Sequence, residues 1–263
     1  MRLAFFGGVY NNYLALEAAI NDAHARGAER LYCLGDLGAF GPHPDRVFPF
    51  IFENNIECIQ GNYDHSIGND LDDCHCGYTD PRDNHFAQIS YNYTLKNTSE
   101  KNRRWMRGLP TEIRFEFDGV RFLLCHGSPR KTNEFLWEST TSTHFLEKLA
   151  KDYEADVILG THTGIHWKRQ LKQGGFFANV GVLGRPENDG SINVWYTFIR
   201  TGQDANDSTL DVEFIPIEYD HQRLITEMHD EGLPQEFSET IATGFWTTCL
   251  EVLPGKERRG GQY

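Results

Sequence analysis

Four short apolar segments of this chain each end close to a glycine and to a side chain that can bind a divalent metal ion. The segments are Cys33-Leu-Gly-Asp36, Ile59-Gln-Gly-Asn-Tyr-Asp64, Phe122-Leu-Leu-Cys-His-Gly127 and Val157-Ile-Leu-Gly-Thr-His162. The candidate ligands at their ends are Asp36, Asn62, His126 and His162. Carboxylate, amide and imidazole groups form a mixed nitrogen and oxygen set that suits Mn, Fe or Zn. The sequence therefore predicts a divalent metal site.

The segments that must position these ligands read as strands that alternate with helices. Strands are expected at residues 3–6, 31–34 and 56–59, and helices at about 12–27 and 44–53. Asn12 is placed to cap the first helix, and Pro44 to open the second. This alternation predicts a layered α/β fold whose sites lie at the carboxyl ends of strands.

Residues 66–110 break this rhythm, and we predict that they form a lid insertion over the cleft. A hairpin is expected at 113–125, where Asp118-Gly119 is a tight-turn signal. A helix is expected at 142–153 and strands at 157–159, 176–179, 192–199 and 212–216. Helices should follow Asp220 and surround Phe237, and residues 202–208 should form a polar loop. The organisation predicted is one domain over 1–250 and a flexible tail over 251–263.

The composition limits the classes of partner. The chain has 263 residues and a net charge of -13. An acidic protein is poorly suited to neutralising nucleic-acid phosphates, so no nucleic-acid partner is expected. No apolar stretch approaches the ~20 residues of a membrane span, and we predict a cytoplasmic protein without a membrane partner. Cys33, Cys58 and Cys125 lie in apolar strands and are expected to be reduced and buried.

The order of the four segments and the residues they contain resemble the motifs of the calcineurin-like metallophosphoesterases, in particular of their small bacterial branch. That family carries, in order, the motifs Asp-x-His, Gly-Asp, Gly-Asn-His-Asp, His-Gly and Gly-His-Thr-His. The likeness extends to residues 34–44, 179–190 and 232–234. It implies an α/β two-sheet sandwich flanked by helices, with a divalent metal cofactor. It also implies a small phosphorylated substrate, hydrolysed by a phosphatase or phosphodiesterase.

The chain departs from the family at the first motif. Alignment of residues 12–17 with the helix that follows this motif puts Gly8 at the Asp position and Tyr10 at the His position. In the last motif His162 is kept and Gly164 stands at the final His. An ungapped alignment on Gly160 would instead put threonines, Thr161 and Thr163, at both His positions.

The three lost groups are those that serve the first metal ion in the family. The kept groups are Asp36, the bridging ligand, and the three that serve the second ion. The resemblance therefore implies one surviving metal site and one ion per chain. A second ion is implied only if other groups rebuild the first site, and the candidates are Tyr10, Cys74 and Cys76. The alternative for the cysteines is a surface loop whose thiols pack the lid.

The resemblance also implies roles for neighbouring residues. Tyr63 replaces the family's general-acid histidine, and its reference pKa of about 10 matches neutral pH poorly. His65 is a candidate substitute, and Asp64 is expected to orient a neighbour. Arg130 and Arg185 are candidate phosphate ligands, since a guanidinium fork matches phosphate geometry.

Two other functions stay open beside a mononuclear phosphoric ester hydrolase. A mononuclear Fe or Mn site beside Tyr10 could support redox or lyase chemistry on the same scaffold. Loss of the first motif and of the general-acid histidine is also what a non-catalytic, ligand-binding pseudoenzyme would show. The sequence does not indicate the oligomeric state.

Overall fold

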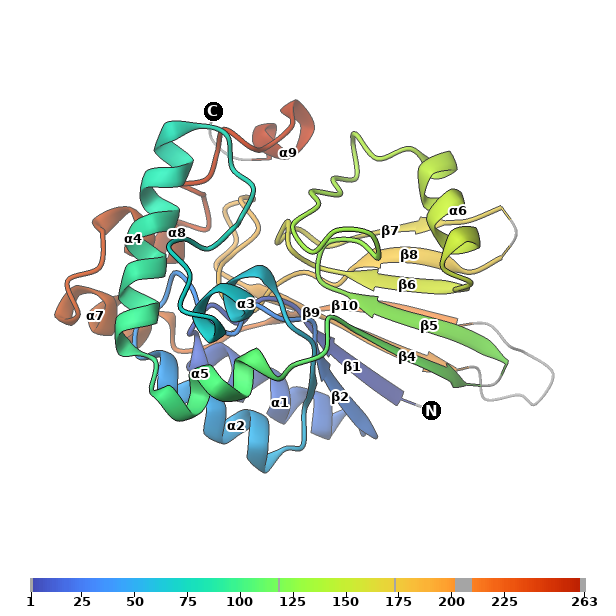
Figure 1. The fold of residues 1–263 in the computed structure, drawn as a ribbon, viewed down its shortest axis with the longest axis horizontal. Coiled ribbons are helices and arrows are strands. Elements are labelled where there is room, and N and C mark those ends of the chain that lie inside the picture. The colour runs from blue at the N-terminus through green and yellow to red at the C-terminus, as the bar shows by residue number, and fades with distance from the viewer. Residues whose placement is uncertain (1, 118, 173, 202–209, 261–263) are drawn as a thin grey trace.

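The computed structural model of the chain describes residues 2–117, 119–172, 174–201 and 210–260. Its strands form two five-stranded sheets that pack face to face (Figure 1). The first has the order β10-β9-β1-β2-β3, from β1 (Arg2–Phe6), β2 (Arg30–Cys33), β3 (Glu57–Cys58), β9 (Val194–Thr201) and β10 (Leu210–Ile217). The second has the order β4-β5-β6-β8-β7, from β4 (Glu112–Phe117), β5 (Val120–Cys125), β6 (Val157–Gly160), β7 (Trp167–Gln170) and β8 (Phe176–Asn179). This confirms the predicted two-sheet sandwich.

Helices cover the outer faces of both sheets (Figure 1). The described residues form the helices α1 (Tyr13–Ala25), α2 (Val47–Glu53), α3 (Asn62–Gly68), α4 (Pro81–Asn97), α5 (Glu100–Arg107), α6 (Thr143–Asp152), α7 (His221–Asp230), α8 (Gln235–Thr243) and α9 (Gly255–Arg259), of which α9 lies apart from both sheets. A 3-10 turn, Pro44–Arg46, leads into α2. The predicted Asn12 cap is confirmed, because its side chain accepts the Ala15 amide at 3.1 Å.

The strands divide their side chains between separate cores, because successive residues of a strand point to opposite faces. Leu3 and Phe5 of β1 pack between the sheets, whereas Ala4 and Phe6 pack toward the helices. In the second sheet, the outward-facing Leu123 of β5 packs in the cluster that includes α6. The result is a helix–sheet–sheet–helix order of layers.

Stacked aromatic rings link the two sheets. Phe5 stacks on Tyr32 with ring centroids 5.2 Å apart, and Tyr32 stacks on Phe115 of the other sheet at 5.3 Å. Phe115 stacks on Phe122 at 4.8 Å. Such ring pairs add to the hydrophobic stabilisation of the interface.

The strands that precede the candidate ligands run parallel within each sheet. β1, β2 and β3 are parallel neighbours, as are β5, β6 and β8. The carboxyl ends of parallel strands lie at one edge of a sheet. The two packed sheets thereby bring the loops after β2, β3, β5 and β6 together.

Several elements differ from the predictions. The antiparallel strand β7 was not expected, and α9 stands within the predicted flexible tail. Glu257 of α9 accepts the Ser139 amide and hydroxyl at 2.9 and 2.6 Å, so contacts of a charged side chain order this segment. Residues 202–208, the predicted polar loop, lie outside the described residues. Within the described residues, no helix is long and apolar enough to cross a membrane.

The aromatic stack yields a stability prediction. Tyr32→Ala should lower the free energy of unfolding by about 3–5 kcal/mol, because it leaves a cavity between the sheets. Tyr32→Phe should change it by less than about 1 kcal/mol, since the Tyr32 hydroxyl has no hydrogen-bond partner. Urea unfolding of both variants measures this difference. Equal losses in the two variants would contradict the assigned role of the ring.

Candidate metal centre

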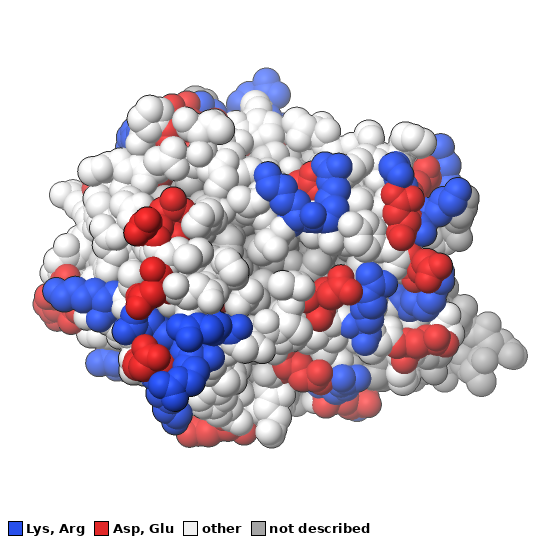
Figure 2. Space-filling view, viewed as in Figure 1, with Lys and Arg blue, Asp and Glu red and all other residues white. Residues whose placement is uncertain are grey.

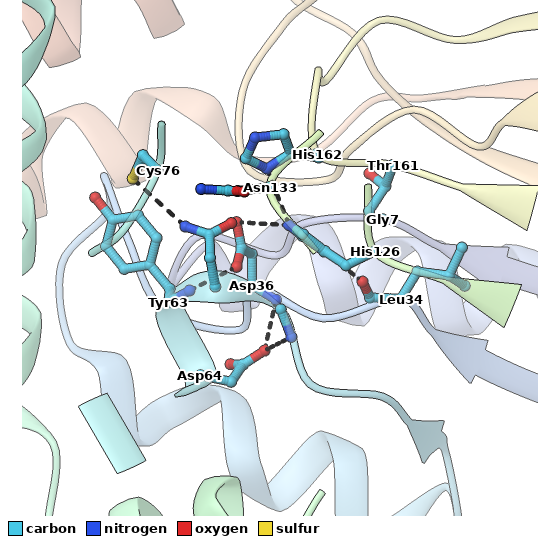
Figure 3. Close-up of polar contacts among 12 residues, drawn as sticks. Gly7, Leu34, Asp36, Tyr63, Asp64, Cys76, His126, Asn133, Thr161 and His162 are labelled. Atoms are coloured by element: carbon cyan, nitrogen blue, oxygen red, sulfur yellow. Dashed lines mark hydrogen bonds and ion pairs between the residues drawn. The ribbon is translucent and has the colours of Figure 1, made fainter. Parts of the chain in front are cut away.

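Asp36, His126 and His162 form a buried cluster where the loops of the two sheets meet (Figure 3). One ligand atom from each of the three lies within 4.8 Å of the others. Nε2 of His126 is 3.2 Å from Oδ2 of Asp36 and 3.3 Å from Nδ1 of His162. The structure thus brings together three of the four predicted metal ligands, although they come from segments far apart in the sequence.

The backbone is unusual at two of these ligands. Asp36 has φ 57° and His162 has φ 51°, in the left-handed region that non-glycine residues seldom adopt. Such conformations cost about 1–3 kcal/mol each and concentrate at functional sites. They turn both side chains sharply out of the strand direction and into the cluster.

Asp64 holds the loop that carries Asp36. Its carboxylate accepts the amides of Asp36, Gly61 and Leu37 at 2.7, 2.8 and 3.0 Å. Burial and the neighbouring Asp36 charge raise the pKa of Asp64 to about 6, against these hydrogen bonds. The prediction that Asp64 orients a neighbour is thereby given a physical basis.

The tautomer of His126 follows from its contacts. Nδ1 lies 2.6 Å from the Leu34 carbonyl oxygen, which can only accept, so Nδ1 carries the hydrogen. In the neutral ring, Nε2 then directs a lone pair at the Asp36 carboxylate. Burial opposes the charged ring, but the charge of Asp36 outweighs it and raises the pKa of His126. A proton or a cation is needed between these two acceptors, and a carbonyl bond at the other nitrogen is typical of metal-binding histidines.

Two further atoms that could bind a metal ion, both from the predicted ligands, have no hydrogen-bond partner. These atoms are Nε2 of His162 and Oδ1 of Asn62, both buried. Burial, with the neighbouring His126, lowers the pKa of His162 to about 3, so its ring stays neutral. Buried polar atoms without partners are costly and rare. Because these two atoms lack partners and lie beside Asp36 and His126, they are suited to bind a divalent cation there.

Asn62 is held beside the cluster by contacts with Cys74 and Cys76. It begins α3, and its Nδ2 donates to the Cys74 carbonyl at 2.9 Å and approaches Sγ of Cys76 at 3.5 Å. That orientation leaves the amide oxygen available as a ligand atom. Gly61 is required next to it, because a Cβ there would lie 2.3 Å from Oδ1 of Asp36.

The structure disagrees with the prediction that Cys74 and Cys76 supply thiolates to a rebuilt metal site. The two are joined by a disulfide, and neither sulfur is then a thiolate. The alternative of two packed thiols is wrong for the same reason. Their separation of two residues brings the sulfurs close without help from the rest of the fold. Cys33, Cys58 and Cys125 are free and buried, as predicted.

A small cavity of about 50 Å³ adjoins the cluster. Asp36, Asn62 and His162 lie in its wall, with Tyr10, Tyr63 and Arg185 from the predicted set. Cys76, another predicted candidate, also lies in the wall. The remaining lining residues were not predicted as site residues: Ala39, Phe40, Tyr78, Phe86, Ala87, Ser90, Phe237, Thr248 and Cys249. Only the tertiary structure reveals these.

Two predicted site residues lie away from this cavity. His65 is exposed, and its Nδ1 faces Oε1 of Gln60 at 3.2 Å. Arg130 is half exposed, forms an ion pair with Glu134, and packs over the Phe145 ring at 4.7 Å. Neither residue is among those that line the cavity. Tyr63, in contrast, is buried in the wall and donates to the Ser90 hydroxyl at 3.2 Å.

Comparison with known families supports the resemblance seen in the sequence. Residues 1–201 match the family model described as the calcineurin-like phosphoesterase superfamily domain. The chain belongs to this superfamily. Because the match spans the loops after β1, β2, β3, β5 and β6, the buried Asp36, His126 and His162 occupy the phosphoesterase part of the chain.

Proteins from three other organisms are similar to this chain over most of its length. PH1004 from Pyrococcus horikoshii, a hypothetical protein, superposes with a TM-score of 0.76 at 21% identity, over 94% of this chain and 99% of that one. A metallophosphoesterase from Sphaerobacter thermophilus gives 0.69 at 21% identity, over 93% and 99%. Uncharacterized protein MJ0912 of Methanocaldococcus jannaschii is 22% identical over 92% of this chain and 98% of its own length. At this identity the solved structures establish the fold.

The cluster predicts metal content. Protein purified without added metal should hold one divalent ion per chain by elemental analysis. His126→Ala and His162→Ala should each weaken metal binding by at least about 10–100-fold. Loss of a residue that only hydrogen-bonds a ligand lowers metal affinity by that factor, and loss of the ligand itself should lower it at least as much. His144→Ala, at an exposed position on α6, is the matched control and should leave metal content unchanged. Two ions per chain would contradict the single site and indicate that Tyr10 or another group binds a second ion.

The Asp64 contacts predict a structural defect. Asp64→Asn should lower the free energy of unfolding by about 1–3 kcal/mol, because an amide cannot satisfy the backbone donors equally well. Metal affinity should fall with it, as Asp36 loses its support. Asp230→Asn, at an exposed position of α7, serves as control. Unchanged stability and metal affinity in Asp64→Asn would refute the positioning role.

Proposed function

We propose that this chain is a metal-dependent phosphoric ester hydrolase that works with one metal ion. The observation that carries the proposal is the buried Asp36, His126 and His162 cluster, which lies in a chain of the phosphoesterase superfamily. The unpartnered atoms of His162 and Asn62 support the same assignment. Asp36, Asn62, His126 and His162 would hold the ion, and Mn, Fe and Zn all suit this donor set.

The chemistry such an ion supplies is Lewis-acid activation of a phosphoryl oxygen and of a water molecule. The chain's own residues orient the ligands and exclude solvent. Asp64 and the Leu34 carbonyl fix the Asp36 and His126 side chains, and the lid residues Cys76 and Tyr78 cover the cavity.

Tyr63 is the candidate general acid among the residues that line the cavity. Burial raises its pKa, so the hydroxyl stays protonated throughout the physiological range. It can donate a hydrogen bond to a leaving oxygen, but it transfers its proton poorly near neutral pH. A slow reaction, or a substrate with a good leaving group, follows from this assignment.

A small phosphorylated molecule is the partner that the charge distribution favours. The net charge is -13, and on the face in Figure 2 the basic side chains form separate groups beside acidic ones. The largest basic group on this face lies over α5. A nucleic acid would require a continuous basic surface to neutralise its phosphates.

Hydrolysis of p-nitrophenyl phosphate and bis(p-nitrophenyl) phosphate by protein loaded with Mn, Fe or Zn tests the proposal. We expect turnover of at least one substrate. The turnover rate should be about hundredfold or more lower in His126→Ala, because removing the ion forfeits several kcal/mol of transition-state stabilisation. His144→Ala should retain full turnover. Absence of turnover in metal-loaded protein with either substrate would reject the hydrolase and favour a ligand-binding module.

A further inference from the structure

Arg185 is a buried cation beside the metal cluster. Its side chain is 7% exposed and lines the same cavity as Asp36, Asn62 and His162. The guanidinium carbon lies 3.5 Å from the ring centroid of Trp246 and 5.9 Å from that of Phe40. Arginine stays charged even when buried, and a guanidinium stacks readily on aromatic rings.

This guanidinium forms no ion pair with a carboxylate of the described residues, and its Nε has no hydrogen-bond partner. The polar groups that influence it most are Cys249, which hydrogen-bonds it, and Tyr78 and Tyr10, whose hydroxyl pKa values burial raises well above the usual value. Burial raises the pKa of the nearby Asp83, an effect that the Arg185 charge only partly offsets, and the Asp83 carboxylate accepts the Val252 amide at 3.2 Å. A buried charge without a paired counter-charge is expensive, so the geometry calls for an anion in the cavity.

The Tyr10 ring fills the space beside Gly8 and Gly184, next to Arg185 in the chain. A Cβ at Gly8 would lie 2.4 Å from Cε1 of Tyr10, and one at Gly184 would lie 2.2 Å from Cδ2 of the same ring. A Cβ at Gly164 would make ordinary contacts with Cγ2 of Val182 at 3.5 Å and with Cζ2 of Trp246 at 3.7 Å. The positions that aligned with the missing ligands therefore face the Tyr10 ring and the indole that carries Arg185.

We propose that Arg185 binds the terminal phosphoryl group of the substrate and is the fixed positive charge that accompanies a single metal ion. This inference rests on the proposed hydrolase function. The planar N–H fork of arginine matches two phosphoryl oxygens, and charge-assisted hydrogen bonds are strong where aromatic walls reduce the water content. The walls here include Phe40, Phe86 and Phe237.

The dimensions of the cavity favour phosphate monoesters as the substrate class. A space of about 50 Å³ holds a few water molecules or one oxyanion head group. The terminal phosphoryl group of a monoester can enter it with a single substituent directed outward. A diester would have to place substituents on two oxygens within the same aromatic walls.

Binding of inorganic phosphate to metal-loaded protein, measured by titration calorimetry, tests the proposal. Arg185→Met should weaken binding by about thirtyfold or more, since it removes one partner of a buried charged contact. Arg185→Lys should recover part of the affinity. Arg104→Gln, an exposed arginine on α5 beside Glu100, is the matched control and should bind phosphate like the wild type. Bis(p-nitrophenyl) phosphate should bind more weakly than phosphate to the wild type.

A thermal scan separates recognition from packing. In phosphate-free buffer Arg185→Met should keep or raise Tm, because an unpaired buried charge is removed, and it should lose the rise in Tm that phosphate causes. Metal content should stay at the wild-type level.

Three results would overturn the inference. These are an unchanged phosphate affinity in Arg185→Met, a lowered Tm without phosphate, and loss of the metal ion together with phosphate. The first leaves the hydrolase proposal intact. A different outcome separates the two proposals. If phosphate binding to metal-loaded or chelator-treated protein depends on Arg185 but neither ester is hydrolysed, Arg185 keeps its role in phosphate recognition and the hydrolase proposal fails.

Discussion

The buried carboxylate of Asp64 is the constraint on which the geometry of the candidate metal centre depends. By accepting the amides of Asp36, Leu37 and Gly61, it ties the loop after β2 to the loop after β3. Tyr63 returns the contact by donating its amide to Oδ1 of Asp36 at 3.0 Å. Two loops of one sheet thereby become a single rigid support, and the unusual backbone of Asp36 is held in place by it.

The second sheet joins this support through His126. Its Nδ1 bonds the Leu34 carbonyl at the end of β2, so a ligand from one sheet is oriented by the backbone of the other. Aromatic stacking between Tyr32 and Phe115 sets the spacing of the sheets behind this bond. The position of His126 relative to Asp36 therefore depends on how the two sheets pack, since a shift of one sheet would move His126 away from Asp36.

The loss of the family's first motif has a structural counterpart. Tyr10 covers Gly8 and Gly184, while Trp246 from the C-terminal segment lies near Gly164 and stacks on Arg185. An aromatic wall with one buried cation thus stands beside the cluster. Cys76 and Tyr78 belong to the same wall, and the disulfide-bonded Cys74 accepts a hydrogen bond from Asn62 through its carbonyl.

The sequence alone determined the local elements and which residues are candidate metal ligands. Apolar runs that end in Gly-Asp, Gly-Asn, His-Gly or Thr-His predicted the strands and the four donor residues, because strand pattern and ligand chemistry are properties of short segments. It missed β7 and α9, which depend on pairing and surface contacts with distant residues. Only the tertiary structure decided that His65 and Arg130 point away from the cavity and that Arg185 lies in it. Those outcomes depend on which side chains from remote parts of the chain share one buried space, and spacing along a sequence carries no information about that.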